Sequence, residues 1–185
     1  MNKINMGTEI VWVYGNSGAG KETFMRTISE EKPFDVINRF GWADKKIIPC
    51  IESIKWIAQY KDDPRGEERK KLPAIILRLA AKTNSVVLIK GQNLDLLAGR
   101  LRETRTRLPQ CRHKIIFIKT KIDEVYERLK RKPWWKKYYT KKYIRESINN
   151  QIKEIKDLQK EFEITAISGN AGENYKIVNF PHAKI

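Results

Sequence analysis

The sequence predicts a single α/β domain in which a parallel β-sheet is covered by helices on both faces. Residues 10–13 form an apolar run that enters a glycine-rich loop and then a helical pattern. Four further short runs rich in β-branched residues alternate with segments of helical periodicity. The 185 residues contain no repeat, low-complexity tract or Gly/Ser linker, so one domain over residues 1–185 is expected.

The individual elements follow from these patterns in chain order. After the first strand, residues 22–31 are expected as a helix, residues 34–39 as the second strand and residues 40–46 as a loop. The further expected helices are 51–60, 72–82, 94–108, 123–132 and 141–162, and the further expected strands are 86–89, 114–118 and 163–167. In a parallel sheet of this kind, ligands bind at the carboxyl ends of the strands.

The glycine-rich loop carries the most specific signal in the chain. Gly15, four intervening residues and then Gly20-Lys21 have the spacing of a P-loop, whose backbone N–H groups point at phosphate oxygens. The positive end of the following helix adds to this field. The residues expected to bind the phosphates of ATP are Gly15, Asn16, Ser17, Gly18, Ala19, Gly20, Lys21, Glu22 and Thr23.

The positions that hold magnesium in this motif are altered. The residue after the lysine is normally Ser or Thr, and here it is Glu22, followed by Thr23. Lys90 ends the strand after which many P-loop enzymes carry an aspartate. Glu22, Thr23 and Asp95 are therefore the candidate Mg²⁺ ligands, and the alternative is an ion held mostly by phosphates and water. Whether Glu22 binds the metal directly, through water or not at all stays open.

The order of these features resembles that of P-loop nucleoside and nucleotide kinases over about residues 8–168. The resemblance implies a P-loop NTPase three-layer sandwich with a mobile lid after the fourth strand, at about residues 128–143. Cations in such a lid neutralise the charge that develops on the transferring phosphoryl group. The lid cations implied here are Arg128, Lys130, Arg131 and Lys132, with Lys21, Arg128 and Arg131 as catalytic residues.

Residues 34–39 add a finer resemblance, to a stretch of phage polynucleotide kinases in which an acid after the arginine is the general base. Phe40 stands at that place in this chain. The resemblance leaves Asp44 as the candidate base and Arg39 as a contact to the acceptor, with Asp95 as the rival base. Asp44 could equally be an ordinary turn residue beside two lysines.

The charge distribution points to a polyanionic partner. The formal net charge is +16, and residues 100–145 hold 17 Lys or Arg against four acids. Residues 130–143 interleave cations with aromatic rings, which suits phosphate contacts and stacking on unpaired bases. The candidate nucleic-acid contacts are Lys130, Lys132, Trp134, Trp135, Lys136, Lys137, Tyr138, Tyr139, Arg100, Arg102 and Arg105. The alternatives are lysines scattered over solvated faces and tryptophans that cap the core.

These features predict an ATP-dependent kinase that transfers the γ-phosphate to a hydroxyl on nucleic acid, with DNA favoured over RNA. The chain resembles phage P-loop DNA kinases that act on 5-hydroxymethyluracil in DNA, which implies a hydroxymethylated pyrimidine as acceptor. The alternatives are a polynucleotide 5′-hydroxyl kinase, a (deoxy)nucleoside monophosphate kinase and a nucleotide-gated nucleic-acid-binding module. Residues 120–123 resemble the guanine-reading motif of GTPases, but no Asp-x-x-Gly follows the third expected strand, and Asp123 is expected as a helix cap.

The composition also bounds the setting. No apolar run approaches the roughly 20 residues of a membrane-spanning helix, and no signal-peptide pattern opens the chain. Cys50 and Cys111 lack metal-binding spacing, and the two histidines are isolated. We therefore expect a cytoplasmic protein, in the host cytoplasm if a phage encodes it, with no membrane partner. The sequence leaves the oligomeric state open.

Overall fold

A five-stranded parallel sheet forms the centre of the molecule. The computed structural model describes residues 7–49, 84–90, 94–132 and 139–179, and only the backbone of residues 94–97 and 100. The strand order is β2-β3-β1-β4-β5, and every neighbouring pair is parallel. The strands are β1 (Glu9–Tyr14), β2 (Lys46–Pro49), β3 (Ser85–Lys90), β4 (Arg112–Lys119) and β5 (Glu163–Ser168).

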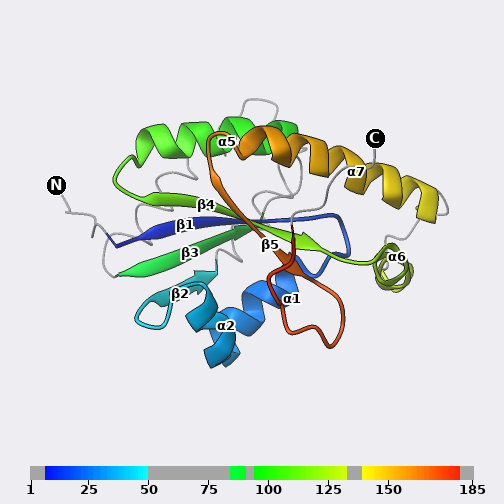
Figure 1. The fold of residues 1–185 in the computed structure, drawn as a ribbon, viewed down its shortest axis with the longest axis horizontal. Helices are drawn as coiled ribbons and strands as arrows, with labels where there is room; N and C mark the ends of the chain where they lie inside the picture. Colours follow the sequence, from blue (N-terminus) through cyan, green and yellow to red (C-terminus); the bar gives the residue numbers. More distant parts are fainter. Residues whose placement is uncertain (1–6, 50–83, 91–93, 133–138, 180–185) are drawn as a thin grey trace.

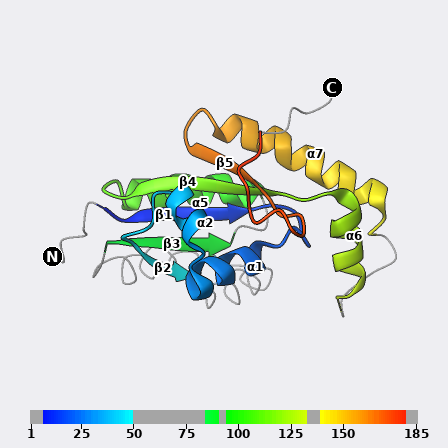
Figure 2. The ribbon, with the colours of Figure 1, turned by 60° about the horizontal axis from the view of Figure 1, so that its bottom comes forward.

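Helices cover both faces of this sheet (Figure 1). They are α1 (Lys21–Arg26), which continues as a π-helical turn η1 (Thr27–Glu31), α2 (Phe34–Arg39), α5 (Leu94–Arg107), α6 (Ile122–Lys130) and α7 (Lys141–Leu158). Helices α5 and α7 lie on one face, and α1 and α2 lie on the other. Figure 2 shows α6 beyond the carboxyl ends of the strands, beside the start of α7.

The central strand shows why three layers form. Ile10, Trp12 and Tyr14 of β1 are buried under α5 and α7, while Val11 and Val13 are buried under α1 and α2. Successive side chains of a strand point to opposite faces, so a strand that is apolar at every position needs cover on both sides. This layered architecture confirms the α/β fold class predicted from the sequence.

The second strand was predicted in the wrong place. Residues 34–39 form helix α2, and the strand is β2, in the stretch just after the expected loop. Val36 and Ile37 are both buried against the same sheet face, while Phe34 is 73% exposed. Two adjacent apolar residues can share one face of a helix but not one face of a strand, and this packing decides between the two structures.

The remaining differences concern helix ends. Helix α7 ends at Leu158 rather than at residue 162, and Asp123 does not cap α6, because Lys121 occupies the N-cap position. The Asp123 carboxylate instead forms an ion pair with the Lys141 ammonium at 2.6 Å. The helices expected over 51–60 and 72–82 lie outside the described residues. Within the described ranges, no helix is both long and apolar enough to cross a membrane.

Candidate active site

The glycine-rich loop connects the carboxyl end of β1 to the start of α1. Gly18 and Gly20 have φ angles of 81° and 96°, a left-handed backbone that side chains with a Cβ rarely adopt. A Cβ on Gly18 would also lie 3.2 Å from the backbone carbonyl oxygen of Val125 in α6. Glycine is therefore required at this position both by conformation and by the close approach of α6.

Lys21 folds back over this loop. Its Nζ donates hydrogen bonds to the carbonyl oxygens of Gly15, at 2.6 Å, and Asn16, at 2.8 Å, and the residue is only 6% exposed. Burial, reinforced by the positive charge of Lys90, lowers the pKa of Lys21 from 10.5 to about 7. Burial and the neighbouring positive charge thus destabilise the ammonium form of Lys21 in the folded protein.

A cavity of about 770 Å³ opens beside the loop. The described residues that line it are Ser17, Gly18, Gly20, Lys21, Glu22, Thr23, Lys90, Arg128, Arg131 and Lys132. Five of these ten carry a positive charge and one carries a negative charge. Such a concave, cationic surface next to loop amides favours a polyanionic ligand. The structure therefore brings three of the predicted lid cations to the phosphate-binding loop.

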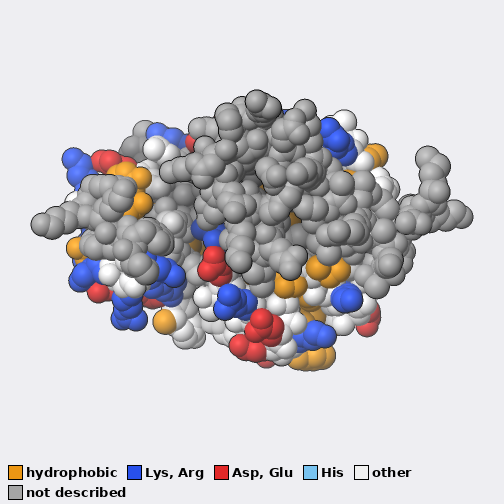
Figure 3. Space-filling model, turned by 180° about the vertical axis from the view of Figure 1, so that it is seen from behind, with side chains coloured by type: hydrophobic (Ala, Val, Ile, Leu, Met, Phe, Trp, Pro, Cys, Tyr) orange, Lys and Arg blue, Asp and Glu red, His pale blue; other side chains and the backbone are white. Residues whose placement is uncertain are grey.

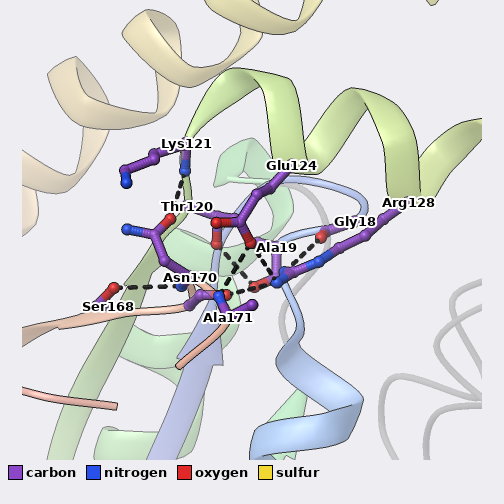
Figure 4. Close-up of polar contacts among 10 residues, drawn as sticks. Gly18, Ala19, Thr120, Lys121, Glu124, Arg128, Ser168, Asn170 and Ala171 are labelled. Carbon is purple, nitrogen blue, oxygen red and sulfur yellow. Dashed lines mark hydrogen bonds and ion pairs between the residues drawn. The ribbon is translucent and has the colours of Figure 1, made fainter. Parts of the chain in front are cut away.

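Arg128 is fixed against the loop by three partners. Its guanidinium donates to the carbonyl oxygens of Gly18, at 3.3 Å, and Gly169, at 2.8 Å, and to the Glu124 carboxylate at 2.8 Å (Figure 4). The loop after β1, the loop after β5 and α6 are thereby held together. Sequence reasoning missed Glu124, although its position four residues before an arginine on a helix is a recognisable ion-pair spacing.

Two segments meet beside the same loop: residues 120–123, which resemble the guanine-reading motif of GTPases, and the residues just after β5. Thr120, after β4, donates from Oγ1 to the Ala19 carbonyl oxygen at 2.9 Å, and the Lys121 backbone N–H donates to Asn170 Oδ1 at 2.8 Å. The Ala171 N–H, after β5, donates to the Glu124 carboxylate at 3.0 Å. These contacts connect the loops at the carboxyl edge of the sheet, and they give the two segments a structural role.

The candidate magnesium ligands do not form a metal site among the described residues. The Glu22 carboxylate forms an ion pair with the Lys90 ammonium and accepts a hydrogen bond from it at 2.5 Å. This hydrogen bond lowers the pKa of Glu22. Thr23 is exposed and lines the cavity, while the Asp95 side chain lies outside the described residues. No group of three or more His, Cys, Asp or Glu suited to a metal ion occurs in the described part of the chain. The P-loop fold implies Mg²⁺, but the described donors, a Glu22 carboxylate already paired with Lys90 and the Thr23 hydroxyl, do not fit a protein-held ion.

Asp44 lies at the opposite edge of the sheet from the loop, which argues against the predicted role as base. It precedes β2, next to Lys45, whose ammonium donates to the carbonyl oxygen of Gly7 at 2.8 Å, before the start of β1. The loop follows the end of the six-residue β1, so about 20 Å of strand separates the two places. The structure does not bring Asp44 to the cavity beside the loop.

Arg39 also lies away from that cavity. Its guanidinium donates to the Tyr175 carbonyl oxygen at 3.0 Å, and it lines a separate hollow of about 430 Å³ with Lys114 and Glu163. Lys114 and Glu163 lie near the starts of β4 and β5, so this hollow is away from the carboxyl edge of the sheet. The contact to an acceptor that the sequence suggested is not made at the loop.

The candidate nucleic-acid contacts fall into separate groups. Arg102 and Arg105 on α5 form ion pairs with Glu161, at 2.6 Å and 3.8 Å, on the face covered by α5 and α7. Lys130 pairs with Glu127 at 3.4 Å. Tyr139 is half-buried and packs edge-on against the Tyr143 ring at 5.6 Å between centroids. The side chain of Arg100 and all of Trp134, Trp135, Lys136, Lys137 and Tyr138 lie outside the described residues.

Comparison with known proteins supports the fold. No protein-family model matches the chain, and no curated protein matches it. A solved structure from the PezAT chromosomal toxin–antitoxin system of Streptococcus pneumoniae is similar, with a TM-score of 0.54 and 16% identity over 99% of this chain and 77% of that chain. A shikimate kinase from Bacteroides thetaiotaomicron has a TM-score of 0.48 and 13% identity over 87% of this chain and 86% of that chain.

A gluconokinase from Sinorhizobium meliloti is also similar, with a TM-score of 0.46 and 18% identity over 89% of this chain and 83% of that chain. At such identities the likeness concerns the arrangement of elements. The five-stranded parallel sheet, with helices on both faces and the glycine-rich loop after β1, is a P-loop, nucleotide kinase-like α/β fold. The fold implied by the sequence resemblance is therefore confirmed.

Proposed function

We propose that this protein is an ATP-dependent phosphotransferase that moves the γ-phosphoryl group to a hydroxyl. The observation that carries the proposal is the cavity of about 770 Å³, in which the loop amides and Lys21 meet Lys90, Arg128, Arg131 and Lys132. In the proposed reaction the acceptor oxygen bonds to the γ-phosphorus and the bond to the β–γ bridging oxygen breaks. ADP leaves with that electron pair, and the acceptor proton passes to a base.

The cations suit this reaction because negative charge spreads over the phosphoryl oxygens in the transition state. Arg128 is held by the Gly18 and Gly169 carbonyls, so its guanidinium is already placed when the ligand arrives. Asp95, in the first turn of α5 after β3, is the proposed base, since the carboxyl edge of the sheet carries both the loop and this turn. No step is assigned to Mg²⁺, because the donors among the described residues, Glu22 and Thr23, do not fit it.

We propose nucleic acid, with DNA preferred over RNA, as the acceptor, and a hydroxymethylated pyrimidine as its reacting group. The net charge of +16 supports this choice. Lys and Arg side chains gather at the end of the molecule that carries α6 and the start of α7 (Figure 3). The exposed cations on these two elements and just after α6 include Lys130, Arg131, Lys132, Lys141 and Lys142.

A small acceptor, such as a nucleoside monophosphate, is the second candidate. The cavity volume supports it, because small-molecule sites commonly measure roughly 300–1,000 Å³. The ion pairs of Arg102 and Arg105 with Glu161 also reduce the charge that α5 offers to a polymer. The two candidates differ in how far the acceptor extends beyond the cavity.

Labelled ATP distinguishes these acceptors. The protein is incubated with DNA containing hydroxymethyluracil, unmodified DNA with a free 5′-hydroxyl, RNA and nucleoside monophosphates, and Lys21→Ala serves as the inactive control. Transfer to hydroxymethyluracil DNA that weakens steeply between low and moderate salt supports the proposal, since counterion release scales with phosphate contacts. Transfer only to mononucleotides, with little salt dependence, selects the second candidate. ATP binding without transfer to any acceptor would contradict a kinase function.

A further inference from the structure

Glu22, after the P-loop lysine, and Lys90, at the end of β3, are the two altered magnesium positions, and they contact each other. Lys90 is the last residue of β3 and lies opposite Val13, the penultimate residue of β1, which leads into the glycine-rich loop. Glu22 lies in the first turn of α1. The Lys90 Nζ and the Glu22 Oε1 are 2.5 Å apart, and both residues line the phosphate-binding cavity. The replacements of a hydroxyl by an acid and of an acid by a lysine thus form one unit.

This unit places a cation where an anion would be expected. In the P-loop motif, the hydroxyl after the lysine binds magnesium beside the phosphates. Here Glu22 instead holds Lys90, whose side chain is 12% exposed, while the Glu22 side chain is 50% exposed. The carboxylate therefore lies toward solvent and the ammonium lies deeper, near the loop.

Lys90 and Lys21 both line this cavity. After burial, the positive charge of Lys90 is the second cause of the lowered pKa of Lys21, because the two ammonium groups repel each other. Arg128, Arg131 and Lys132 add further positive charge around the cavity. A ligand with several negative oxygens relieves this repulsion, and the gain is larger because Lys90 is mostly shielded from water.

We infer that Lys90, positioned by Glu22, is a fixed phosphate-binding cation that replaces a protein-held Mg²⁺. This inference rests on the proposed function. Triphosphate binding by this protein consequently does not require a divalent metal. Glu22 is a positioning residue, because it acts by holding the Lys90 ammonium at the loop. If the pair were only a surface ion pair, it would contribute little to stability and nothing to ligand binding.

The test is ATP binding, measured by calorimetry, in excess EDTA and in excess Mg²⁺. For the wild-type protein we expect dissociation constants that agree within about threefold in the two conditions. Lys90→Met is expected to weaken binding in EDTA at least tenfold. Lys46→Met is the matched control, because Lys46 is an exposed strand lysine at the opposite edge of the sheet, and it should bind like the wild type.

The double variant Glu22→Ser, Lys90→Asp restores the usual residue types of the motif, and we expect it to bind ATP only with Mg²⁺. Wild-type binding that appears only with Mg²⁺, or a Lys90→Met variant that binds like the wild type in EDTA, would overturn the inference while leaving the proposed function intact. Failure to bind ATP in both conditions would overturn the proposed function and the inference together. The wild-type comparison needs no variant, so it holds even if a substitution prevents folding.

Discussion

The lowered pKa of Lys21 predicts that ATP binding takes up a proton above neutral pH. In the free protein the pKa of Lys21 is about 7, against an ordinary value of 10.5. A bound triphosphate stabilises the ammonium form and raises this pKa. The affinity for ATP is therefore highest below pH 7 and falls as the pH rises above 7, because binding must then add a proton to Lys21.

The magnitude follows from the same pKa of about 7. At pH 8 only about one tenth of free Lys21 carries the proton, so binding takes up about 0.9 proton if the bound pKa is near or above its ordinary value. Between pH 8 and pH 9 the affinity falls about tenfold, or about 1.4 kcal/mol. The phosphate itself interferes little at pH 8, because its second pKa is about 6.

Calorimetry in two buffers of different ionisation enthalpy measures this proton uptake. Lys21→Arg is the matched control, since a guanidinium stays charged and its binding should take up no proton from this residue. Uptake below about 0.2 proton at pH 8 in the wild type, or equal uptake in Lys21→Arg, would refute the assignment of the titration to Lys21. The free fold should also gain stability as the pH rises from about 7 toward 10.5, because only the unfolded chain keeps the proton there.

Three further predictions concern the loop and the opposite edge of the sheet. Gly18→Ala should lower the free energy of unfolding by at least about 1–2 kcal/mol, because the φ of 81° strains an alanine. The control Gly99→Ala, in an open part of α5, should not destabilise the protein. Equal shifts of the thermal unfolding midpoint in the two variants would contradict this. Asp44→Asn should leave phosphotransfer within about twofold of the wild type, and a loss of tenfold or more would return Asp44 to the catalytic machinery. Glu9→Gln should cost about 1–3 kcal/mol at pH 7, measured by urea unfolding, because the buried Glu9 carboxylate accepts from Trp42 at 3.2 Å and Lys45 at 2.6 Å. Burial raises the pKa of the Glu9 carboxylate, but its hydrogen bonds and nearby lysines outweigh burial and lower this pKa below 4.5. The cost of Glu9→Gln should therefore vanish as the pH falls from 4.5 through the lower folded-state pKa. A cost that does not depend on pH would argue against a charged Glu9 in the folded protein.

The local sequence determined four of the five strands and the glycine-rich loop. The apolar runs that became β1, β3, β4 and β5 are short and bounded by polar or turn residues, and Gly15, Gly18 and Gly20 mark a backbone path that few other residues permit. These signals are local, because they depend on side-chain pattern and backbone conformation within about ten residues. They were sufficient for the fold class and for the position of Lys21.

Tertiary structure decided what the local pattern left ambiguous. Val36 and Ile37 are compatible with a strand or a helix, and only packing against the sheet made residues 34–39 helical, which moved Arg39 away from the cavity. The place of Asp44 depended on which strand follows it and on the parallel direction of that strand. The pairing of Glu22 with Lys90 joins residues 68 positions apart, and no local pattern encodes such a contact. The chain itself thus specified a glycine-rich loop with P-loop spacing. The fold determined which charges surround that loop, because those charges come from segments that meet only at the carboxyl edge of the sheet.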